Sequence, residues 1–558
     1  MRIRDISKYK ADNLYDVCII GSGPAGLTLC AELIHSGLKI CVLESGDKRP
    51  NPQINTLREV INIGEIKIKI SSRERILGGT STTWTGLSAP LDEIDMEQRD
   101  YLSYPSHWPI KLSDLKPYYE RASDYGFPDL NKFKSVELIK IRQTGDFILE
   151  SSILTEKNFI AADPPWNFGK QLYSIFDNKN IDLYLDATVI NLSSKKESDN
   201  ITRISTANVT NSFGSKTNIK AKIFVLATGG LESVRLLLLS KETNPQGLGN
   251  ETDQVGRYLM NHPKGNFGRL NFKKPVKSLP YLFGYLNQGW SGYTGLRLNE
   301  DFQKQQKILN SYLRFEPIFP WTDNQGVWNM IMIVKRLKSL LQWWKHQQTQ
   351  LVELRDWNET GDDQEDSTGK KLDFNWLKAI QTIIKELPAV GSYIRYRLFP
   401  QKPVKIKTVR LRNFMEMEPR PENRLSLSDQ LDRNGLALPS VNLNTSDLDH
   451  RSLIELHRVF KEEMSLKQIG KVETTLTETK PWPINTEASH HLGGTRMGKD
   501  PNTSVVDNNL KIHTVSNLYI CSGSVFPTSG CANPTYTICA LAIKLADHLK
   551  KNYSPLKS

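Results

Sequence analysis

The sequence predicts an α/β fold, α+β overall, divided into at least two domains. A short apolar run, a glycine-rich turn and a helical pattern follow one another at residues 15–34, and a strand followed by a helix recurs at residues 517–551. Between them, roughly at residues 270–485, strand patterns and helical patterns mix. With 558 residues, the chain is also longer than one hydrophobic core usually supports.

Composition restricts the class of protein. Hydrophobic residues make up 38% and charged residues 24% of the chain, which is close to the globular average and argues against a disordered or fibrous protein. The amino terminus lacks the apolar run of a secretory signal, and no stretch of about 18 apolar residues could span a bilayer, so we expect a cytoplasmic location. The six cysteines show neither disulfide nor zinc spacing, so we expect buried thiols and no metal site.

The formal net charge is +12, which favours anionic partners in general. A charge total describes long-range attraction and identifies no particular partner. Because no nucleic-acid-binding motif accompanies the charge, we expect no nucleic-acid partner.

The first apolar run belongs to a nucleotide-binding unit. Residues 15–20 (YDVCII) predict a strand, residues 21–26 (GSGPAG) a tight turn, and the pattern through Ile34 a helix. A second strand at residues 38–43 ends on Glu44. The order of strand, glycine turn, helix, strand and acidic residue is typical of dinucleotide binding.

Each part of this unit has a physical task. Gly21 permits the turn, Gly23 lets the backbone approach a pyrophosphate, and Gly26 lets the helix and strand pack closely. The amino terminus of the helix then faces the phosphates. Glu44 is placed to accept hydrogen bonds from a ribose hydroxyl, which disfavours a 2′-phosphate and hence NADP.

Two later segments bear on which nucleotide binds. Residues 75–86 combine two adjacent glycines, small hydroxyl side chains and a tryptophan; such a loop can lie flat against a planar ligand, although a turn with a core tryptophan fits equally well. Residues 222–227 predict a strand that ends on Thr228 and Gly229 before a helix. No second G-x-G-x-x-G occurs, so we expect no separate NAD domain, while the fingerprint alone leaves FAD and NAD open.

Two amphipathic helices are predicted in the central stretch. Apolar residues recur at helical spacing within residues 327–348, with lysine and arginine on the other face, and a second helix is expected near residues 374–387. The acidic and polar segment between them, residues 358–371, predicts a mobile loop. A basic, tryptophan-bearing helix can lie in a membrane interface, but an apolar stripe more often packs on a core or on a second subunit, which we favour here.

The carboxyl-terminal part holds the candidate catalytic residues. His490 and His491 precede a glycine-rich turn, and a helix begins near Asn533 with a proline in its first turn and lysines in its last. A helix amino terminus aimed at a flavin ring would stabilise negative charge on the reduced ring. Taken separately, such a histidine is more often structural, and such an asparagine is more often an ordinary helix cap.

Taken together, these segments resemble the glucose-methanol-choline (GMC) oxidoreductase family, and within it the branch of pyranose 2-oxidase and fructose dehydrogenase-like enzymes. The resemblance covers most of the chain, and its motifs occur in the order of the family. They are residues 21–26 with Glu44, residues 78–81 with Trp84, and residues 227–229, 255–263, 490–498 and 533–535.

The resemblance implies a Rossmann-like FAD-binding domain assembled from both chain ends (residues 1–125, 175–270 and 486–558), plus a β-sheet-and-helix substrate domain (residues 126–174 and 271–485). It also implies an enzyme that oxidises a CH–OH group of a sugar, polyol or other alcohol. In the family a histidine takes the hydroxyl proton while hydride passes to flavin N5. Oxygen, a quinone or a redox protein could each accept the electrons.

The catalytic residues follow from the resemblance by position. Ungapped counting from residues 496–498 puts His490 on the base, whereas counting from residues 493–495 with one gap puts His491 there. Asn533 matches the asparagine that hydrogen-bonds the same hydroxyl.

The cofactor residues follow from the same segments. Thr83 stands where a related loop carries a histidine bonded covalently to FAD, so noncovalent FAD is predicted. Val189 matches the region whose backbone contacts the adenine of FAD. The full set of predicted cofactor residues is Gly21, Ser22, Gly23, Pro24, Ala25, Gly26, Glu44, Gly79, Thr80, Ser81, Thr83, Trp84, Val189, Ala227, Thr228, Gly229, Gly523, Ser524, Asn533, Pro534 and Thr535.

Two other functions are compatible with this fold. One is a lyase that keeps FAD as a structural group, because a fold does not determine a function. The other is a membrane-associated dehydrogenase that passes electrons to a quinone and contacts the bilayer through the basic helix at residues 327–348. The motifs identify neither the substrate nor the oligomeric state, because pocket shape within residues 270–485 determines specificity.

Overall fold

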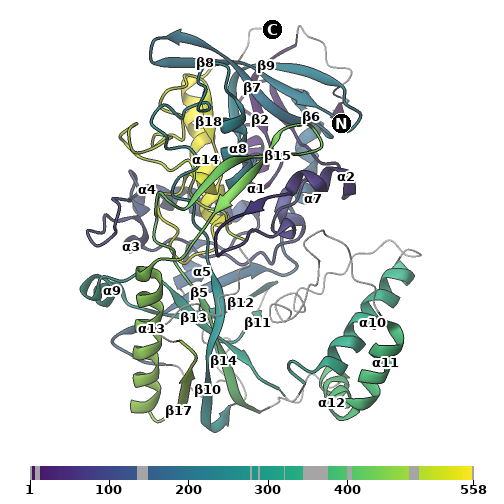
Figure 1. Cartoon of the computed structure of the whole chain (residues 1–558), viewed down its shortest axis with the longest axis vertical. Coiled ribbons are helices and arrows are strands. Elements are labelled where there is room, and N and C mark those ends of the chain that lie inside the picture. Colours follow the sequence, from purple (N-terminus) through teal and green to yellow (C-terminus); the bar gives the residue numbers. More distant parts are fainter. Residues whose placement is uncertain are drawn as a thin grey trace.

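Three β-sheets organise the computed structural model of the protein (Figure 1). The structure describes residues 3–4, 6, 13–134, 149–276, 279–286, 289–319, 321–342, 375–398, 405–476 and 489–555. The largest sheet lies in the upper half of the view near both chain ends, and the second sheet lies in the lower half. The predicted α/β class is confirmed.

The first sheet has eight strands and is largely parallel. Its order is β1-β6-β3-β2-β9-β8-β7, and β18 also pairs with β9. Because β18 comes from the far end of the sequence and pairs in parallel with β9, both chain ends build this sheet, as predicted. The strands are β1 (Ile3–Arg4), β2 (Leu14–Ile20), β3 (Ile40–Leu43), β6 (Ile181–Tyr184), β7 (Thr188–Ser198), β8 (Ile201–Thr210), β9 (Lys216–Leu226) and β18 (Leu518–Ile520).

Helices cover the parallel part of this sheet, which explains why its strands are apolar on both faces. Every residue of β2 except Leu14 is buried, as is usual for a strand covered on both sides. The carboxyl-terminal helix packs against α1 and α4 and begins directly after Pro534. The helices near this sheet are α1 (Pro24–Glu32), α4 (Leu112–Ala122), α7 (Phe168–Gln171), α8 (Gly229–Leu239) and α14 (Thr535–Asn552).

The second sheet has seven antiparallel strands and its own hydrophobic core. Its order is β11-β12-β13-β14-β10-β17, with β5 paired to β12. Helix α13 (Asp447–Leu466) starts with a capping box at Ser446 and buries Leu453, Phe460 and Met464 in this core. The strands are β5 (Leu154–Ala162), β10 (Lys264–Val276), β11 (Gly284–Leu286), β12 (Trp290–Leu298), β13 (Tyr312–Pro317), β14 (Ile406–Phe414) and β17 (Gly470–Thr474).

The third sheet is small and joins distant segments. β15 (Arg424–Leu431) pairs with β16 (Ala437–Asn442), which pairs in parallel with β4 (Ile61–Asn62). Both β15 and β16 contact α8, so this part of the predicted substrate stretch, residues 271–485, lies against the parallel-sheet region. The domain boundaries stay a prediction.

Short helices connect these layers. The short α-helices are α2 (Pro52–Asn55), α3 (Glu93–Met96), α5 (Leu130–Lys134) and α9 (Glu300–Gln306). The 3-10 helices are η2 (Thr56–Arg58), η3 (Ile70–Ser72), η4 (Gly79–Thr82), η5 (Ser123–Tyr125), η6 (Tyr173–Asp177) and η9 (Gly523–Val525).

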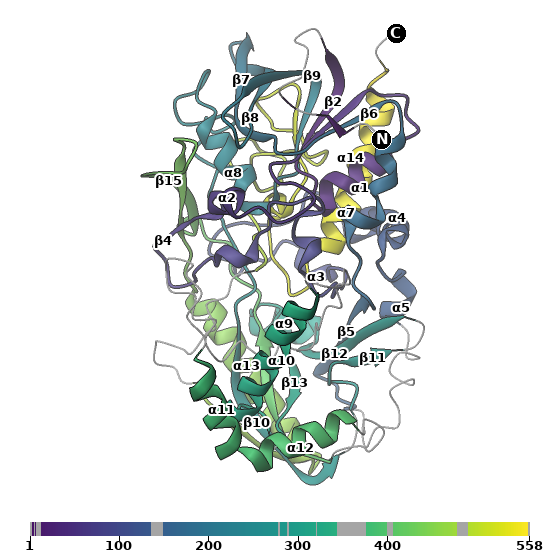
Figure 2. The ribbon, with the colours of Figure 1, turned by 90° about the vertical axis from the view of Figure 1, so that its right-hand side faces the viewer.

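A separate group of three helices lies beside the second sheet (Figures 1 and 2). α10 (Gln325–Gln342), α11 (Trp376–Lys385) and α12 (Leu387–Leu398) share a small core around Trp321 and Val390. The two predicted amphipathic helices are thus confirmed over α10 and α11. The predicted loop at residues 358–371 lies outside the described residues.

The described ranges lack two features, a membrane-spanning helix and a metal cluster. None of the helices in those ranges could cross a lipid bilayer, given its length and polarity. The same ranges contain no cluster of histidine, cysteine and acidic side chains suited to a metal ion. All six cysteines are buried free thiols, as the sequence predicts.

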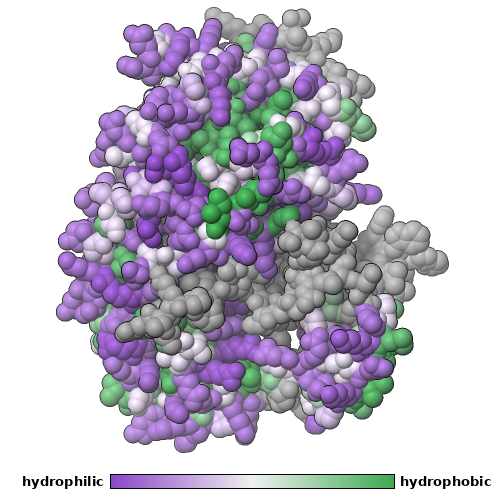
Figure 3. All heavy atoms as spheres, in the orientation of Figure 1, coloured by the Kyte–Doolittle hydropathy of each residue, from purple (hydrophilic) through white to green (hydrophobic). Residues whose placement is uncertain are grey.

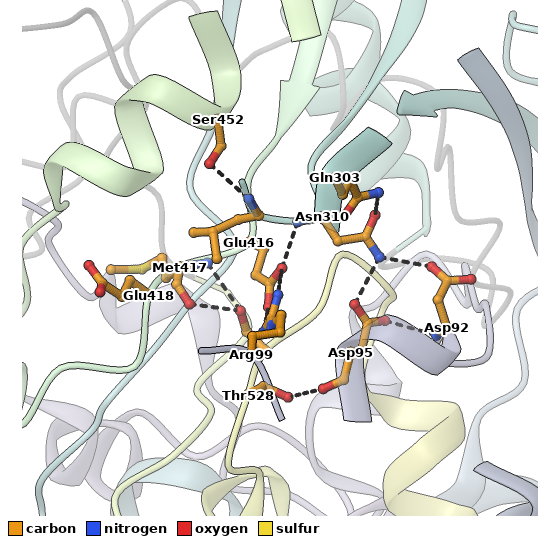
Figure 4. A network of polar contacts seen from close by, with 12 residues as sticks. Asp92, Asp95, Arg99, Gln303, Asn310, Glu416, Met417, Glu418, Ser452 and Thr528 are labelled. Carbon is orange, nitrogen blue, oxygen red and sulfur yellow. Dashed lines mark hydrogen bonds and ion pairs between the residues drawn. The ribbon is translucent and has the colours of Figure 1, made fainter. Parts of the chain in front are cut away.

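A buried polar network joins the second sheet to segments that precede it (Figure 4). Arg99 makes a bidentate ion pair with Glu416, with N–O distances of 2.6 and 3.0 Å, and both side chains are almost fully buried. The backbone N–H of Asn310 also donates to Glu416, at 2.7 Å. The amide of Asn310 donates to Asp92 at 2.9 Å and to Asp95 at 2.8 Å.

Breaking the buried pair should destabilise the fold strongly. We expect Arg99→Ala to cost about 3–5 kcal/mol, because it leaves Glu416 buried without its cation. The matched control is Arg458→Ala, which breaks two exposed ion pairs on α13 and should cost less than about 1 kcal/mol. Urea unfolding of both variants measures the difference in the free energy of unfolding. Equal destabilisation would contradict the view that the buried Arg99–Glu416 pair matters more than exposed pairs.

Candidate active site

A cavity of about 250 Å³ opens where the parallel strands of the first sheet end. Segments far apart in the sequence form its wall, and open α/β sheets bind their ligands at this edge. The predicted cofactor residues that line it are Gly21, Ser22, Gly23, Pro24, Ala25, Glu44, Gly79, Thr80, Val189, Ala227, Thr228, Gly229, Gly523, Pro534 and Thr535.

The glycine-rich turn presents its backbone to the cavity. Gly23 is the N-cap of α1, so the first turn of that helix, with its unpaired N–H groups, belongs to the wall. A Cβ atom on Gly23 would meet nothing within 4 Å, whereas one on Gly26 would lie 2.0 Å from the carbonyl oxygen of Gly21. Gly23 therefore leaves room for a ligand, and Gly26 permits the close packing of helix on turn.

Glu44 is fixed at the end of β3. One carboxylate oxygen accepts hydrogen bonds from the backbone N–H of Ser22 at 3.0 Å and from its hydroxyl at 2.6 Å. The other oxygen accepts from the N–H of Gly46 at 2.8 Å. The hydroxyl of Ser45 also donates to this second oxygen, at 3.4 Å, so a ribose hydroxyl would have only this long bond to displace.

Arginines that the sequence motifs do not single out line the same cavity. Arg73 and Arg75 each contact Glu232 at 2.9 Å, and burial lowers the pKa of Arg73 to about 10 although Glu232 acts in the opposite direction. Within the described part of the chain, Nε of Arg73 and Nε of Arg75 are buried without a hydrogen-bond acceptor. Unsatisfied cationic donors suit an anionic ligand such as a diphosphate.

Six predicted cofactor residues lie outside the wall of this cavity. The indole N–H of Trp84 donates to the carbonyl of Trp166 at 2.8 Å, and its ring packs against Phe127 and Phe168, while its contact with a cofactor stays a prediction. The side chain of Ser81 likewise donates to the carbonyl of Gly78. The six are Gly26, Ser81, Thr83, Trp84, Ser524 and Asn533.

A short backbone bridge brings two histidines together. Met260 and Leu492 form an isolated antiparallel bridge, with N–O distances of 2.8 and 3.0 Å in the two directions. Two residues away on each strand, Nδ1 of His262 lies 2.8 Å from Nδ1 of His490. Gly493 has a φ of +71°, and a Cβ there would lie 1.9 Å from a backbone oxygen, so only glycine permits this approach.

The partners of His262 determine where the protons lie. Its Nε2 is 3.2 Å from the carbonyl oxygen of Ser529, which can only accept, so Nε2 carries the hydrogen. Burial lowers the pKa of His262 to about 4, which keeps the ring neutral and leaves a lone pair on Nδ1. The Nδ1–H of His490 therefore donates to His262.

His490 is then a neutral imidazole with its lone pair on Nε2. Burial lowers the pKa of His490 well below its usual value, and the positive charge of Lys264, or of His262 and His491 when they are protonated, acts in the same direction. His490 and His491 are both half-buried and both line the cavity. His491 differs in its partner, because its Nε2 lies 3.3 Å from the hydroxyl of Ser72.

The loop at residues 528–533 lies against the buried network of Figure 4. The hydroxyl of Thr528 donates to the carbonyl of Asp95 at 2.5 Å and accepts from the indole of Trp108 at 2.9 Å. Burial, with the charges of Asp92 and Glu416, raises the pKa of Asp95 to about 7. This loop carries both the Ser529 carbonyl and, directly before the N-cap of α14, the predicted catalytic Asn533.

Two family models match the chain, and together they contain these site segments. Residues 419–542 match the model described as GMC oxidoreductase, and residues 15–262 match the one described as pyridine nucleotide-disulphide oxidoreductase. The carboxyl-terminal part of the chain, which carries His490 and Asn533, is thus similar to GMC oxidoreductases. Both matches imply that the chain binds a flavin.

Known relatives extend the similarity over more of the chain. The chain is 26% identical to the fructose dehydrogenase large subunit of Gluconobacter japonicus over 59% of its length, and the match spans about half of that relative, 47%. It is 22% identical to the 2-methyl-1,2-propanediol dehydrogenase of Mycolicibacterium austroafricanum over 97% of this chain and 96% of the relative. The pyridoxine 4-oxidase from Mesorbium loti has a similar fold, with a TM-score of 0.52 at 14% identity over 97% of this chain and all of the other.

Filling the space at Gly23 should weaken flavin binding without unfolding the protein. We expect Gly23→Ala to lower flavin affinity roughly tenfold, because the added methyl group enters the cavity and meets no protein atom within 4 Å. The control is Gly391→Ala on α12, where a Cβ also meets nothing. The flavin-to-protein absorbance ratio after dilution measures the effect, and full flavin retention by Gly23→Ala would rule out this binding mode.

Proposed function

We propose that this chain is a GMC oxidoreductase that oxidises a CH–OH group of a sugar, polyol or other alcohol, with noncovalently bound FAD and with His490 as the base. The observation that carries the proposal is the contact between His262 and His490, because it leaves an unprotonated nitrogen at a cavity suited to a dinucleotide. The names of the relatives, fructose dehydrogenase and 2-methyl-1,2-propanediol dehydrogenase, support hydroxyl-bearing substrates.

The base works because it is neutral and oriented. His490 Nε2 would take the proton of the substrate hydroxyl, while the Nδ1–H of His490 stays hydrogen-bonded to His262. The imidazolium formed in this step keeps that hydrogen bond, so the ring does not have to turn. Bound FAD would supply the hydride acceptor for the adjacent carbon.

His490 is the stronger candidate for two reasons. Its ring contacts His262, which is in turn bonded to the loop of Asn533, whereas His491 contacts the hydroxyl of Ser72. Asn533, on the loop that carries the Ser529 carbonyl, would then hydrogen-bond the same substrate hydroxyl, as in the family.

The cofactor would be held by the residues that line the cavity. The backbone of residues 21–25 and the arginines at 73 and 75 suit the diphosphate, and Glu44 suits a ribose. Residues 78–86 contain no histidine, so the attachment point of covalently linked relatives is missing from this loop, which supports noncovalent FAD. Acid precipitation should therefore release the flavin.

Removing the base should slow substrate oxidation but keep the flavin bound. We expect His490→Ala to reduce the rate of anaerobic flavin bleaching by alcohol substrates by about 10²- to 10⁴-fold. The control is the neighbouring His491→Ala, which should retain most of the rate. If His491→Ala loses the rate and His490→Ala does not, His491 is the base. Turnover of substrate by the unaltered protein without flavin bleaching would favour a lyase.

Removing the Nδ1 acceptor of His262 should disturb the orientation of the proposed base, His490, while leaving His490 in place. We expect His262→Phe to slow flavin bleaching by about 10- to 100-fold, as partners that orient a functional histidine commonly do. It should also move the acid limb of the pH–rate profile downward. A neutral His262 accepts the Nδ1–H bond that stabilises protonated His490, so without His262 the pKa of His490 falls and the base stays neutral at lower pH. His262→Gln, which offers an acceptor, should recover part of the rate. A slower enzyme with an unshifted profile would mean that His262 is only structural.

A further inference from the structure

An exposed apolar face covers one side of the three-helix group. Seven large apolar side chains on α11 and α12 are exposed, and Leu377 reaches 76% exposure and Leu398 68%. Figure 3 shows hydrophobic atoms gathered at the lower right, where these helices lie in Figure 1. The seven are Trp376, Leu377, Ile380, Ile384, Leu387, Ile394 and Leu398, and we call them the α11–α12 face.

The α11–α12 face is distinct from the side of α11 that packs inward. Leu377, Ile380 and Ile384 follow one another at helical spacing and point outward. Ala379 is buried, and Ile383 packs on the small core around Trp321, so the inward side of α11 is already packed against the protein. The outward stripe is additional apolar surface, and grouped exposed apolar residues mark interaction sites.

Positive charge surrounds the α11–α12 face. Residues 375–398 carry four cationic side chains, all exposed, and one acidic side chain, Glu386. Glu386 accepts a hydrogen bond from Asn324 at 3.0 Å and so belongs to the packed side. The four cations are Lys378, Lys385, Arg395 and Arg397.

The α10 sequence adds to this charge. Residues 325–342 contain three lysine or arginine residues and no acidic residue. The sequences of the three helices thus carry seven cations and one anion, so a partner of negative charge fits them.

We propose that the α11–α12 face docks on an anionic lipid membrane, with its apolar side chains at the acyl boundary and its cations at the lipid phosphates. A second copy of this chain would place the same cations opposite one another, which like-charge repulsion disfavours. A lipid surface satisfies both the apolar stripe and its cationic rim. The contact is interfacial, because the helix axis lies in the plane of the membrane.

Sedimentation with lipid vesicles tests the proposal on the full chain with its flavin. The protein should sediment with vesicles of phosphatidylcholine and phosphatidylserine and stay in solution with phosphatidylcholine alone. The charge variant Lys378→Gln with Lys385→Gln should bind about 25-fold more weakly, because each basic residue near an anionic surface contributes about fivefold. The apolar variant Leu377→Ser with Ile384→Ser should also lose binding.

A matched variant separates this face from exposed leucines in general. Leu431→Ser with Leu466→Ser replaces two leucines that are 62% and 79% exposed on other elements, and it should bind vesicles like the unaltered chain. Unchanged thermal midpoints would establish that all variants are folded. Failure of the unaltered chain to bind anionic vesicles, equal binding to phosphatidylcholine alone, or equal loss in the matched variant would each overturn the proposal. A dimer in solution that the apolar variant dissociates would assign the face to a second copy instead.

Discussion

The candidate site depends on one constraint: two neutral imidazoles whose Nδ1 atoms lie 2.8 Å apart must share a single hydrogen. The carbonyl of Ser529 fixes the proton on the far nitrogen of His262, so the shared hydrogen belongs to His490. Three distant segments must meet for this to happen. The Met260–Leu492 bridge aligns two of them, and the loop at residues 528–533 supplies the third.

The buried network explains why that loop holds its place. Thr528 is hydrogen-bonded between Trp108 and the backbone of Asp95, and Asp95 receives a bond from Asn310 beside the Arg99–Glu416 pair. Burying so many charges is costly unless each is paired, and here carboxylates meet cations or amide donors. The second sheet and the loop before helix α14 are thereby fixed relative to one another through one polar layer.

Local patterns predicted the local structure well, and tertiary contacts supplied the rest. The strand at residues 15–20, the turn after it and the helix near Asn533 follow from periodicity and from glycine and proline chemistry, and the structure confirms all three. The packing of Trp84 could not be predicted from the sequence, because its partner Trp166 lies 82 positions away. His262 lay within a recognised motif without a role, since its partner is 228 positions away.

The protonation state of His490 can be measured directly by nitrogen NMR of the protein with isotope-labelled histidine. The signals of His490 can be assigned by their loss in His490→Ala. At neutral pH in the resting enzyme, we expect Nδ1 of His490 to carry the hydrogen and Nε2 to have the chemical shift of an unprotonated nitrogen. A hydrogen on Nε2 of His490, or a doubly protonated ring, would contradict it.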